Sequence, residues 1–239
     1  MSKKKKKASE QLAKKGTSAV SKSSGNQIIT LGDAKIGVPQ SEKDTVNITF
    51  PECLLIWTKP LFTPQEILND KGDKSQYYSV SCLWPASQFK TILGLYARGF
   101  SEIGIAKNVA RGIVEGLGAG DKASLRRPDD LFDESKLEAY PFYKGTCTSR
   151  FKNIAKPLVV DVKNKPIEDV RDCGHLSTGK VSIKVYVGYN SSKGLHYYKS
   201  SLMAVRVIEA KEYNEEELAE MKHKQEEQAV LSFNANEMF

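Results

Sequence analysis

Aromatic and basic side chains alternate with apolar ones in the stretch 179–209. Lys184 and Tyr186 stand two positions apart in its first half, and Tyr197 and Lys199 stand two positions apart in its second half. Aromatic rings can stack on nucleobases, and lysine side chains can neutralise phosphates. A surface that carries both is suited to hold a nucleic-acid strand without reading its sequence. This chemistry is binding, and it requires no catalytic group, metal or cofactor.

A second stretch shows the same interleaving. Between positions 146 and 152, strand-like alternation places Arg150 and Lys152 on one face and Cys147 and Phe151 on the other. A single tyrosine is more often half-buried scaffold than a ligand contact, so the hypothesis depends on several such residues on adjacent strands. The candidate DNA-binding residues are Tyr77, Arg126, Arg127, Phe142, Tyr143, Lys144, Arg150, Lys152, Lys184, Tyr186, Tyr197 and Lys199.

Two other patterns could carry chemistry. The glycine-rich string 116–122 lacks the phosphate-loop spacing, because Asp121 precedes Lys122 and Ala123 follows it. We interpret it as a helix terminator. An acidic cluster could hold Mg²⁺ in a nuclease, and we keep this as an alternative function, although the cluster lies in a loop and an expected helix start. Its members are Asp129, Asp130, Asp133, Glu134 and Glu138.

The cysteines and histidines form no recognisable metal motif. Cys173 and His175 have no matching pair at zinc-site spacing, so we expect no metal site. The four cysteines show no CxxC pair and are expected to be reduced thiols, with Cys82 and Cys147 facing a core. The sequence has no apolar run of the ~18–20 residues that span a membrane, and its start is not a secretory signal. We therefore expect a cytoplasmic protein.

Charge is distributed unevenly along the chain. The net charge is +7; residues 1–24 contribute +7 and residues 212–239 contribute −6, leaving +6 for the middle. A basic body with a basic arm and an acidic tail indicates a polyanionic ligand, although lysine-rich ends can also serve solubility alone. We expect a disordered basic arm at 1–26, a binding domain at 27–211 and an acidic C-terminal tail at 212–239.

The elements that must position these residues are mostly strands. Alternation predicts strands at 46–50, 77–84, 145–152 and 158–162, with a further apolar piece at 54–57. The piece 28–31 is either an edge strand or part of the arm. Two long strands joined by the turn-rich loop 190–194 predict a hairpin between 179 and 208.

A helical insertion of about 87–120 interrupts the strands. Phe89, Ile92, Leu93 and Tyr96 fall on one helical face, with Ser87 as the expected N-cap, and a second helix is expected within 101–117. A mostly β chain with such an insertion fits an OB-type five-stranded barrel with flexible termini. A β-sandwich is the alternative.

Three blocks of sequence resemble a family of tailed-phage single-stranded DNA-binding proteins with an OB-type fold. The resemblance covers roughly residues 46–209 and implies sequence-independent binding of single-stranded DNA in phage replication or recombination, without catalysis. A structural or RNA-binding phage protein remains a further alternative. The blocks are VNITFPE at 46–52 with LFTP at 61–64 and YYSVS at 77–81; KPLVVD at 156–161 with KPI at 165–167, Gly174 and GKV at 179–181; and YVGYN at 186–190 with KG at 193–194 and Leu202.

The C-terminal stretch resembles the acidic tails of bacterial and phage single-strand-binding proteins. It holds eight glutamates and ends in Phe239. In those families the tail competes with DNA and recruits replication proteins such as a polymerase or helicase. The resemblance implies that Phe239 is a partner-binding residue and that the tail restrains DNA binding.

Overall fold

The fold is described here from a computed structural model, for residues 26–31, 34–39, 44–68, 74–119 and 124–212 and for positions 216 and 219. The predictions for the basic arm and for nearly all of the acidic tail, Phe239 included, therefore lie outside the described residues. So does the end of the glycine-rich string, residues 120–123.

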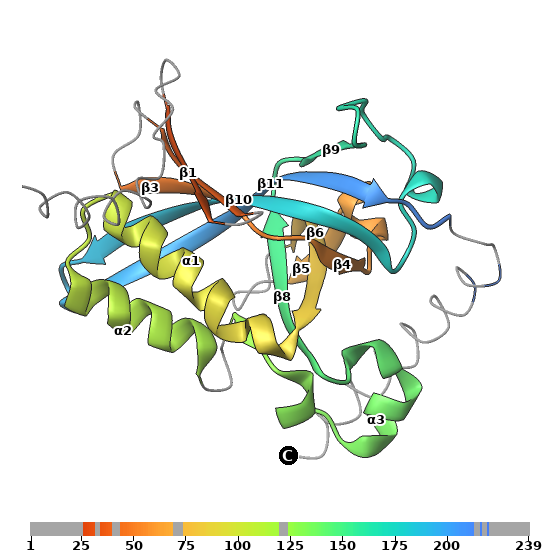
Figure 1. Cartoon of the computed structure of the whole chain (residues 1–239), viewed down its shortest axis with the longest axis horizontal. Coiled ribbons are helices and arrows are strands. Elements are labelled where there is room, and N and C mark those ends of the chain that lie inside the picture. Colours follow the sequence, from red (N-terminus) through yellow and green to blue (C-terminus); the bar gives the residue numbers. More distant parts are fainter. Residues whose placement is uncertain are drawn as a thin grey trace, which may run out of the picture.

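A curled, mainly antiparallel sheet forms the body of the protein (Figure 1). The strand order is β1-β2-β3-β10-β4-β6-β8-β7; β11 pairs with β10, β9 with β11 and β5 with β6. Only the β9–β11 pair is parallel among the strands that the structure describes. The strands are β1 (Asn26–Leu31), β2 (Ala34–Pro39), β3 (Thr45–Thr49), β4 (Cys53–Ile56), β5 (Gln65–Leu68), β6 (Lys74–Pro85), β7 (Leu125–Arg126), β8 (Thr146–Asn153), β9 (Leu158–Val160), β10 (Ser177–Asn190) and β11 (Leu195–Glu209).

Strand β10 links the two halves of the sheet. Its first residues pair with β4, its middle pairs with β3, and β11 runs along its other edge. Gly179 stands where β10 passes between β4 and β11: a Cβ at this position would lie 2.8 Å from both Leu55 Cδ1 and the Arg206 carbonyl oxygen. Glycine therefore permits the close approach of backbones on which the curl depends.

The hairpin of β10 and β11 is confirmed, with two register shifts, one between Thr178 and Gly179 and one between Ser182 and Ile183. The register skips Met203, since Ser182 pairs with Ala204 and Ile183 with Leu202. Such a bulge increases local twist. Next to it, the Asn153 side chain of β8 donates a hydrogen bond of 2.8 Å to the Leu202 carbonyl, which joins β8 to β11 across the open side of the curled sheet.

The helical insertion covers one face of the sheet (Figure 1). It consists of α1 (Phe89–Glu102) and α2 (Lys107–Gly118), and a short α3 (Glu134–Ala139) follows before β8. Helix α1 lies close to β3, because a Cβ on Gly99 would lie 3.2 Å from Ile48 Cδ1. The expected capping by Ser87 is wrong: Ser87 belongs to a 3-10 turn, and the N-cap position falls on Gln88, whose side chain makes no cap hydrogen bond.

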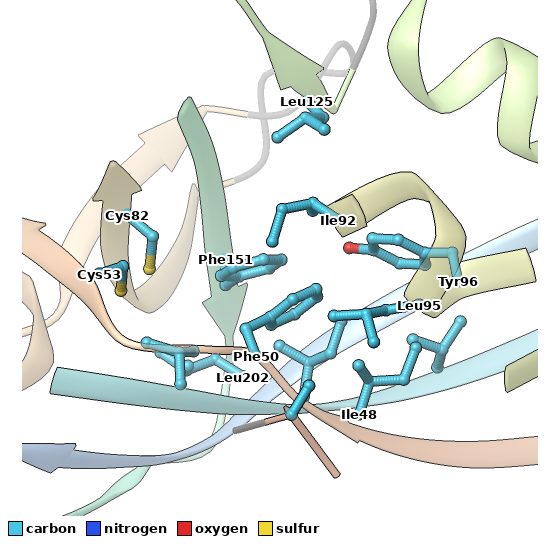
Figure 2. Packing of buried hydrophobic residues seen from close by; sticks show 14 of the residues in the cluster. Ile48, Phe50, Cys53, Cys82, Ile92, Leu95, Tyr96, Leu125, Phe151 and Leu202 are labelled. Atoms are coloured by element: carbon cyan, nitrogen blue, oxygen red, sulfur yellow. The ribbon is translucent and has the colours of Figure 1, made fainter. Parts of the chain in front are cut away.

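The core lies between the curled sheet and α1 (Figure 2). Phe50 stacks on Phe151 with ring centroids 5.1 Å apart, and Ile92, Leu95 and Tyr96 of α1 pack against the same cluster. Burial of this apolar surface is the main favourable contribution to folding. The inward residues of β10 complete it: Val181, Ile183, Val185 and Val187 are all buried.

The predicted class, mostly β with a helical insertion, is confirmed, and the OB-type barrel takes the form of a curled half-barrel. The predicted strands are present with small shifts of their ends, and 28–31 lies in edge strand β1. Strands β1, β2, β5, β7 and β9 extend the sheet beyond five strands. Between the helical insertion and β8, where no strand was predicted, the chain forms the short strand β7.

Candidate nucleic-acid interface

The outer face of the β10–β11 hairpin brings together four of the predicted residues, which we call the hairpin patch: Lys184, Tyr186, Tyr197 and Lys199. Tyr186 pairs with Lys199 across the two strands, and their side chains therefore share a face. The Tyr186 and Tyr197 rings lie edge to face with centroids 6.3 Å apart, and the Lys199 Nζ is 5.7 Å from the Tyr197 ring. Both rings are exposed, at 40% for Tyr186 and 38% for Tyr197.

Glycine at position 188 shapes this patch. Gly188 pairs with Tyr197 across the hairpin. A Cβ there would lie 2.5 Å from Tyr197 Cζ and 2.9 Å from Tyr186 Cε1. Both distances are shorter than any real carbon contact, so the end of the Tyr197 ring occupies the space that a side chain at position 188 would fill. In the hairpin patch each tyrosine thus has a lysine two positions away on the same face of its strand: Lys184 for Tyr186 and Lys199 for Tyr197.

A groove over β6, β7 and β8 collects a second set of predicted residues. Strand β8 presents Arg150 and Lys152 outward, as alternation predicted, and β7 places Arg126 opposite Thr148. The groove encloses about 420 Å³. Its lining residues are Ser81, Ser124, Arg126, Pro128, Leu131, Phe132, Tyr143, Thr148, Ser149, Arg150 and Lys152.

Neutral groups hold two of the groove's cations in place. The Arg150 guanidinium donates to Gln65 Oε1 at 2.7 Å and to Ser79 Oγ at 3.0 Å. The Arg150 side chain is open to solvent overall, yet burial of its charged end among the groove residues lowers the pKa of its guanidinium. The Lys152 Nζ lies 5.0 Å from the centre of the Tyr77 ring, a cation–π distance, which places Tyr77 at the edge of the groove.

An aromatic cluster borders the groove, and sequence reasoning found only part of it. Phe142 and Tyr143 were predicted; Trp57 and His175 were not assigned to a site. Phe142 packs against Tyr143 at 4.7 Å and against His175 at 5.0 Å, and the Trp57 Nε1 donates to Tyr143 Oη at 3.2 Å. Phe142 therefore supports Tyr143. Trp57 and His175 are 118 positions apart in the sequence, so no local pattern signals their contact.

His175 is held neutral inside this cluster. Its Nδ1 accepts a hydrogen bond of 3.3 Å from the backbone N–H of Trp57. Burial, with a smaller effect of the positive charge of Lys211, lowers the pKa of His175 to about 4. Trp57 directly follows β4 and has a φ of 56°, a left-handed backbone conformation that is strained for a bulky residue. The histidine bond helps to hold this turn.

Two predicted residues lie apart from both surfaces. The Arg127 guanidinium carbon lies 4.4 Å from the centre of the Phe89 ring, at the start of α1, rather than in the groove. Lys144 is exposed and follows the turn that carries Phe142 and Tyr143. The hairpin patch and the groove are also separate surfaces. In Figure 1 the far end of the hairpin lies at the left, whereas α3, which follows the groove residues Leu131 and Phe132, lies at the lower right.

The acidic cluster has structural uses. Asp129 accepts hydrogen bonds from the Gly145 backbone N–H at 3.0 and 3.3 Å, and Asp133 caps α3 by accepting from the Lys136 N–H at 2.8 Å. This bond lowers the pKa of Asp133. Within the described ranges, no group of three or more histidine, cysteine, aspartate or glutamate side chains is arranged to hold a metal ion.

All four cysteines are free and buried, which confirms that Cys82 and Cys147 face a core and adds Cys53 and Cys173. Burial raises the pKa of Cys147 to about 11 and that of Cys173 to about 12. A thiol reacts through its thiolate, so these values describe structural cysteines at neutral pH. Of the helices in the described part of the chain, none has the length and apolar character needed to cross a membrane.

Comparison with known proteins gives structural matches only. No family model and no curated protein matches the sequence. The structure is similar to that of the single-stranded DNA-binding protein from bacteriophage Enc34, as a C-terminal truncation (13% identity, TM-score 0.48, 72% of this chain and 94% of that one) and in complex with single-stranded DNA (12%, 0.48, 72% and 93%). It is also similar to gp2.5, a single-stranded DNA-binding protein encoded by bacteriophage T7 (17%, 0.42, 73% and 93%). The matched proteins are thus of the kind that the sequence blocks resemble.

Proposed function

We propose that this protein binds single-stranded DNA without sequence preference. The observation that carries the proposal is the hairpin patch, where two exposed tyrosine rings lie beside lysines on the face opposite a complete apolar core. A solved Enc34 protein to which the chain is similar holds the same ligand.

The proposed contacts are non-covalent. Bases of an unpaired strand stack on Tyr186 and Tyr197, each stacked base contributing ~1–3 kcal/mol, while Lys184 and Lys199 neutralise phosphates. Duplex DNA hides its base faces in its own stack, so the rings favour single strands. The groove supplies further cations through Arg126, Arg150 and Lys152. No catalytic step belongs to this proposal.

The biological setting and the tail complete the proposal. Binding of unpaired strands serves phage DNA replication or recombination in the host cytoplasm. The acidic tail, with eight glutamates and a terminal Phe239, competes with DNA for the basic surfaces and recruits replication proteins. The tail carries a charge of −6 and the body +6, so the tail can bind the basic surfaces weakly and a DNA strand with more charges can displace it.

A fluorescence anisotropy titration tests the main proposal. The full-length protein is titrated against labelled single-stranded DNA, duplex DNA and RNA of one sequence composition. We expect the tightest binding to single-stranded DNA, and Tyr186→Ala with Tyr197→Ala should weaken it by ~5-fold or more per lost stacked base. Equal affinity for duplex and single strands would contradict the proposal, and a preference for RNA would redirect it to that ligand.

A matched control is available on the same hairpin. Tyr189 is exposed at 57% but contacts His196, its ring lying 4.8 Å from the imidazole on the face opposite the hairpin patch. Tyr189→Ala removes the same side chain from the same element and should leave binding unchanged. Thermal melting of each variant separates lost binding from lost folding. If Tyr189→Ala weakened binding as much as the double variant, the outer face would not be the binding surface.

A further inference from the structure

The groove over β6, β7 and β8 differs from an open strand-binding surface because it is bounded. Its volume of about 420 Å³ falls within the range of small-molecule sites, ~300–1,000 Å³. Phe132 and Leu131 from the segment before α3 form one wall, and Tyr143 from the turn before β8 forms another. The hairpin patch, by contrast, lies on the outer face of an exposed hairpin. A bounded pocket suits a single nucleotide better than a run of stacked bases.

Cations and hydroxyls alternate on the floor of this pocket. Across the paired strands, Arg126 stands opposite Thr148 and Arg150 stands opposite Ser81. Paired residues project on the same face of a sheet, so each guanidinium has a hydroxyl donor beside it. Phosphate oxygens accept hydrogen bonds from both kinds of donor, the charged guanidinium and the neutral hydroxyl. Lys152, one step further along β8, adds a third positive charge.

Positive charge dominates the residues that line the pocket in the described part of the chain. Among the described residues that line it, three are cationic and none is acidic. The acceptors that hold Arg150, Gln65 Oε1 and Ser79 Oγ, are both neutral. A guanidinium that is partly removed from water and bonded only to neutral groups is destabilised by desolvation, and a bound anion offsets this effect. Desolvation also lowers the pKa of Arg150. The pocket is therefore prepared for a ligand with more than one negative charge.

An apolar and aromatic wall stands beside the cations. The Phe132 ring meets the Tyr143 ring edge to face at 5.2 Å, and Leu131 is exposed at 48%. Trp57 Nε1 fixes the Tyr143 hydroxyl from behind. A nucleobase or sugar can cover this wall while its phosphate reaches the cations. The ligand chemistry is that of a nucleotide.

We propose that this pocket binds a nucleotide carrying a terminal phosphomonoester, as found at the phosphorylated end of a DNA strand or in a free nucleoside monophosphate. A terminal phosphate carries about −1.5 to −2 charges at neutral pH, whereas a phosphodiester inside a strand carries one. Three cations with hydroxyl donors favour the more highly charged group. The proposal rests on the proposed strand-binding function and refines it, because it adds recognition of strand ends.

Matched short oligodeoxynucleotides test this inference on the full-length protein. They share one sequence and an internal label, and they end in a 5′-phosphate, a 3′-phosphate or hydroxyls at both ends. We expect one phosphorylated form to bind about tenfold more tightly than the hydroxyl form, since a hydrogen bond to a charged group contributes roughly a tenfold change in Kd. Competition with thymidine monophosphate, with thymidine as its control, tests the free nucleotide.

Variants locate the preference. Arg150→Gln should abolish the difference between phosphorylated and hydroxyl ends, and Arg150→Lys should keep only part of it, because lysine retains the charge without the fork. Arg126→Gln provides a second test if Arg150→Gln fails to fold. Lys163→Gln, in an exposed loop outside the pocket, removes the same charge and should keep the full preference.

The outcomes separate the two proposals. Preference for a phosphorylated strand end alone identifies the end as the ligand, and competition by the monophosphate alone identifies the free nucleotide; either result supports the pocket. Equal affinity for all three oligodeoxynucleotides, without competition by the monophosphate, overturns the pocket proposal and leaves strand binding intact. If no oligodeoxynucleotide binds and the monophosphate does not bind either, both proposals fail.

Discussion

Adding a single methyl group at position 188 should weaken DNA binding without removing any polar or aromatic group. In Gly188→Ala the new Cβ would lie 2.5 Å from Tyr197 Cζ and 2.6 Å from Tyr197 Oη. These atoms are at the far end of an exposed side chain, so the ring can swing away from the strand. The Tyr186 ring, with Cε1 at 2.9 Å from the added atom, must move as well. The edge-to-face arrangement of the two rings that we propose as the stacking surface is then lost.

The structure sets the magnitudes. A base stacked on an aromatic side chain contributes ~1–3 kcal/mol, which corresponds to about 5- to 150-fold in Kd. Displacement of the ring leaves some residual contact, so we expect a loss at the lower end, about 5- to 10-fold. The free energy of unfolding should change by less than about 1 kcal/mol, because the only displaced atoms are exposed and alanine is at least as favourable as glycine within a strand.

Anisotropy titration with single-stranded DNA measures the first quantity, and urea unfolding measures the second. Gly37→Ala is the matched control, since it is also a glycine in a strand, and its Cβ would meet no atom within 4 Å. We expect both variants to keep their stability and only Gly188→Ala to bind weakly. Unchanged affinity in Gly188→Ala, with the ring displacement confirmed by the Tyr197 chemical shifts, would refute stacking on this pair.

The remaining predictions concern charge and pH. DNA binding should weaken steeply with salt, with a slope of about −0.7 per contacted phosphate in a plot of log affinity against log salt concentration; an affinity that does not change with salt would contradict the electrostatic contribution. Deletion of residues 1–24 should reduce that slope for every polyanion and keep the preference for single strands. The lowered pKa of His175, about 4 against the usual 6.5, means that the unfolded chain binds more protons between these values. The contribution of His175 to the free energy of unfolding should therefore be complete above pH 6.5 and fall as the pH drops toward 4. The variant His175→Gln, whose side chain can still accept a hydrogen bond from the Trp57 N–H, should show a smaller loss of stability between pH 7 and pH 5 in urea unfolding. An equal loss of stability in both proteins would exclude His175 as the source of the pH dependence. Truncation after Lys211 should tighten binding of single-stranded DNA at low salt, as measured by titration. Deletion of Phe239 alone should abolish capture of a phage polymerase or helicase in a pull-down, and normal capture would exclude a partner-binding role for Phe239.

Local alternation was enough to predict the longer strands β6, β8, β10 and β11, whereas β2, β5 and β7 were not predicted. In β8 buried and more exposed positions alternate from Thr146 to Lys152, and the structure buries Phe151 and exposes Arg150 and Lys152 as expected. The same holds for the first half of the hairpin. Periodicity succeeds here because one face of each strand packs on a single core, so burial and sequence share the period of two.

Other features depend on contacts that no local pattern reveals. The parallel pairing of β9 with β11 and the skip at Met203 are set by the curl of the whole sheet. Trp57 and His175 meet across 118 positions to form a cluster that supports Tyr143. Arg127 follows Arg126 directly in the sequence, yet its guanidinium lies over Phe89 rather than in the groove. Strand β7 ends at Arg126 and Arg127 continues in an extended backbone conformation, in which successive side chains point to opposite faces.

The hairpin shows how one element can serve stability and binding without conflict. Val185 and Val187 of β10 are buried in the core, while Tyr186 between them faces outward and is not required to fill it. Its exposure costs the fold little, because the core is already complete without the ring. The same alternation that makes β10 central to the sheet thus leaves an outward face whose composition folding does not fix. This outward face is therefore free to carry the exposed aromatic rings and lysines for which we propose a ligand that offers flat bases and phosphates.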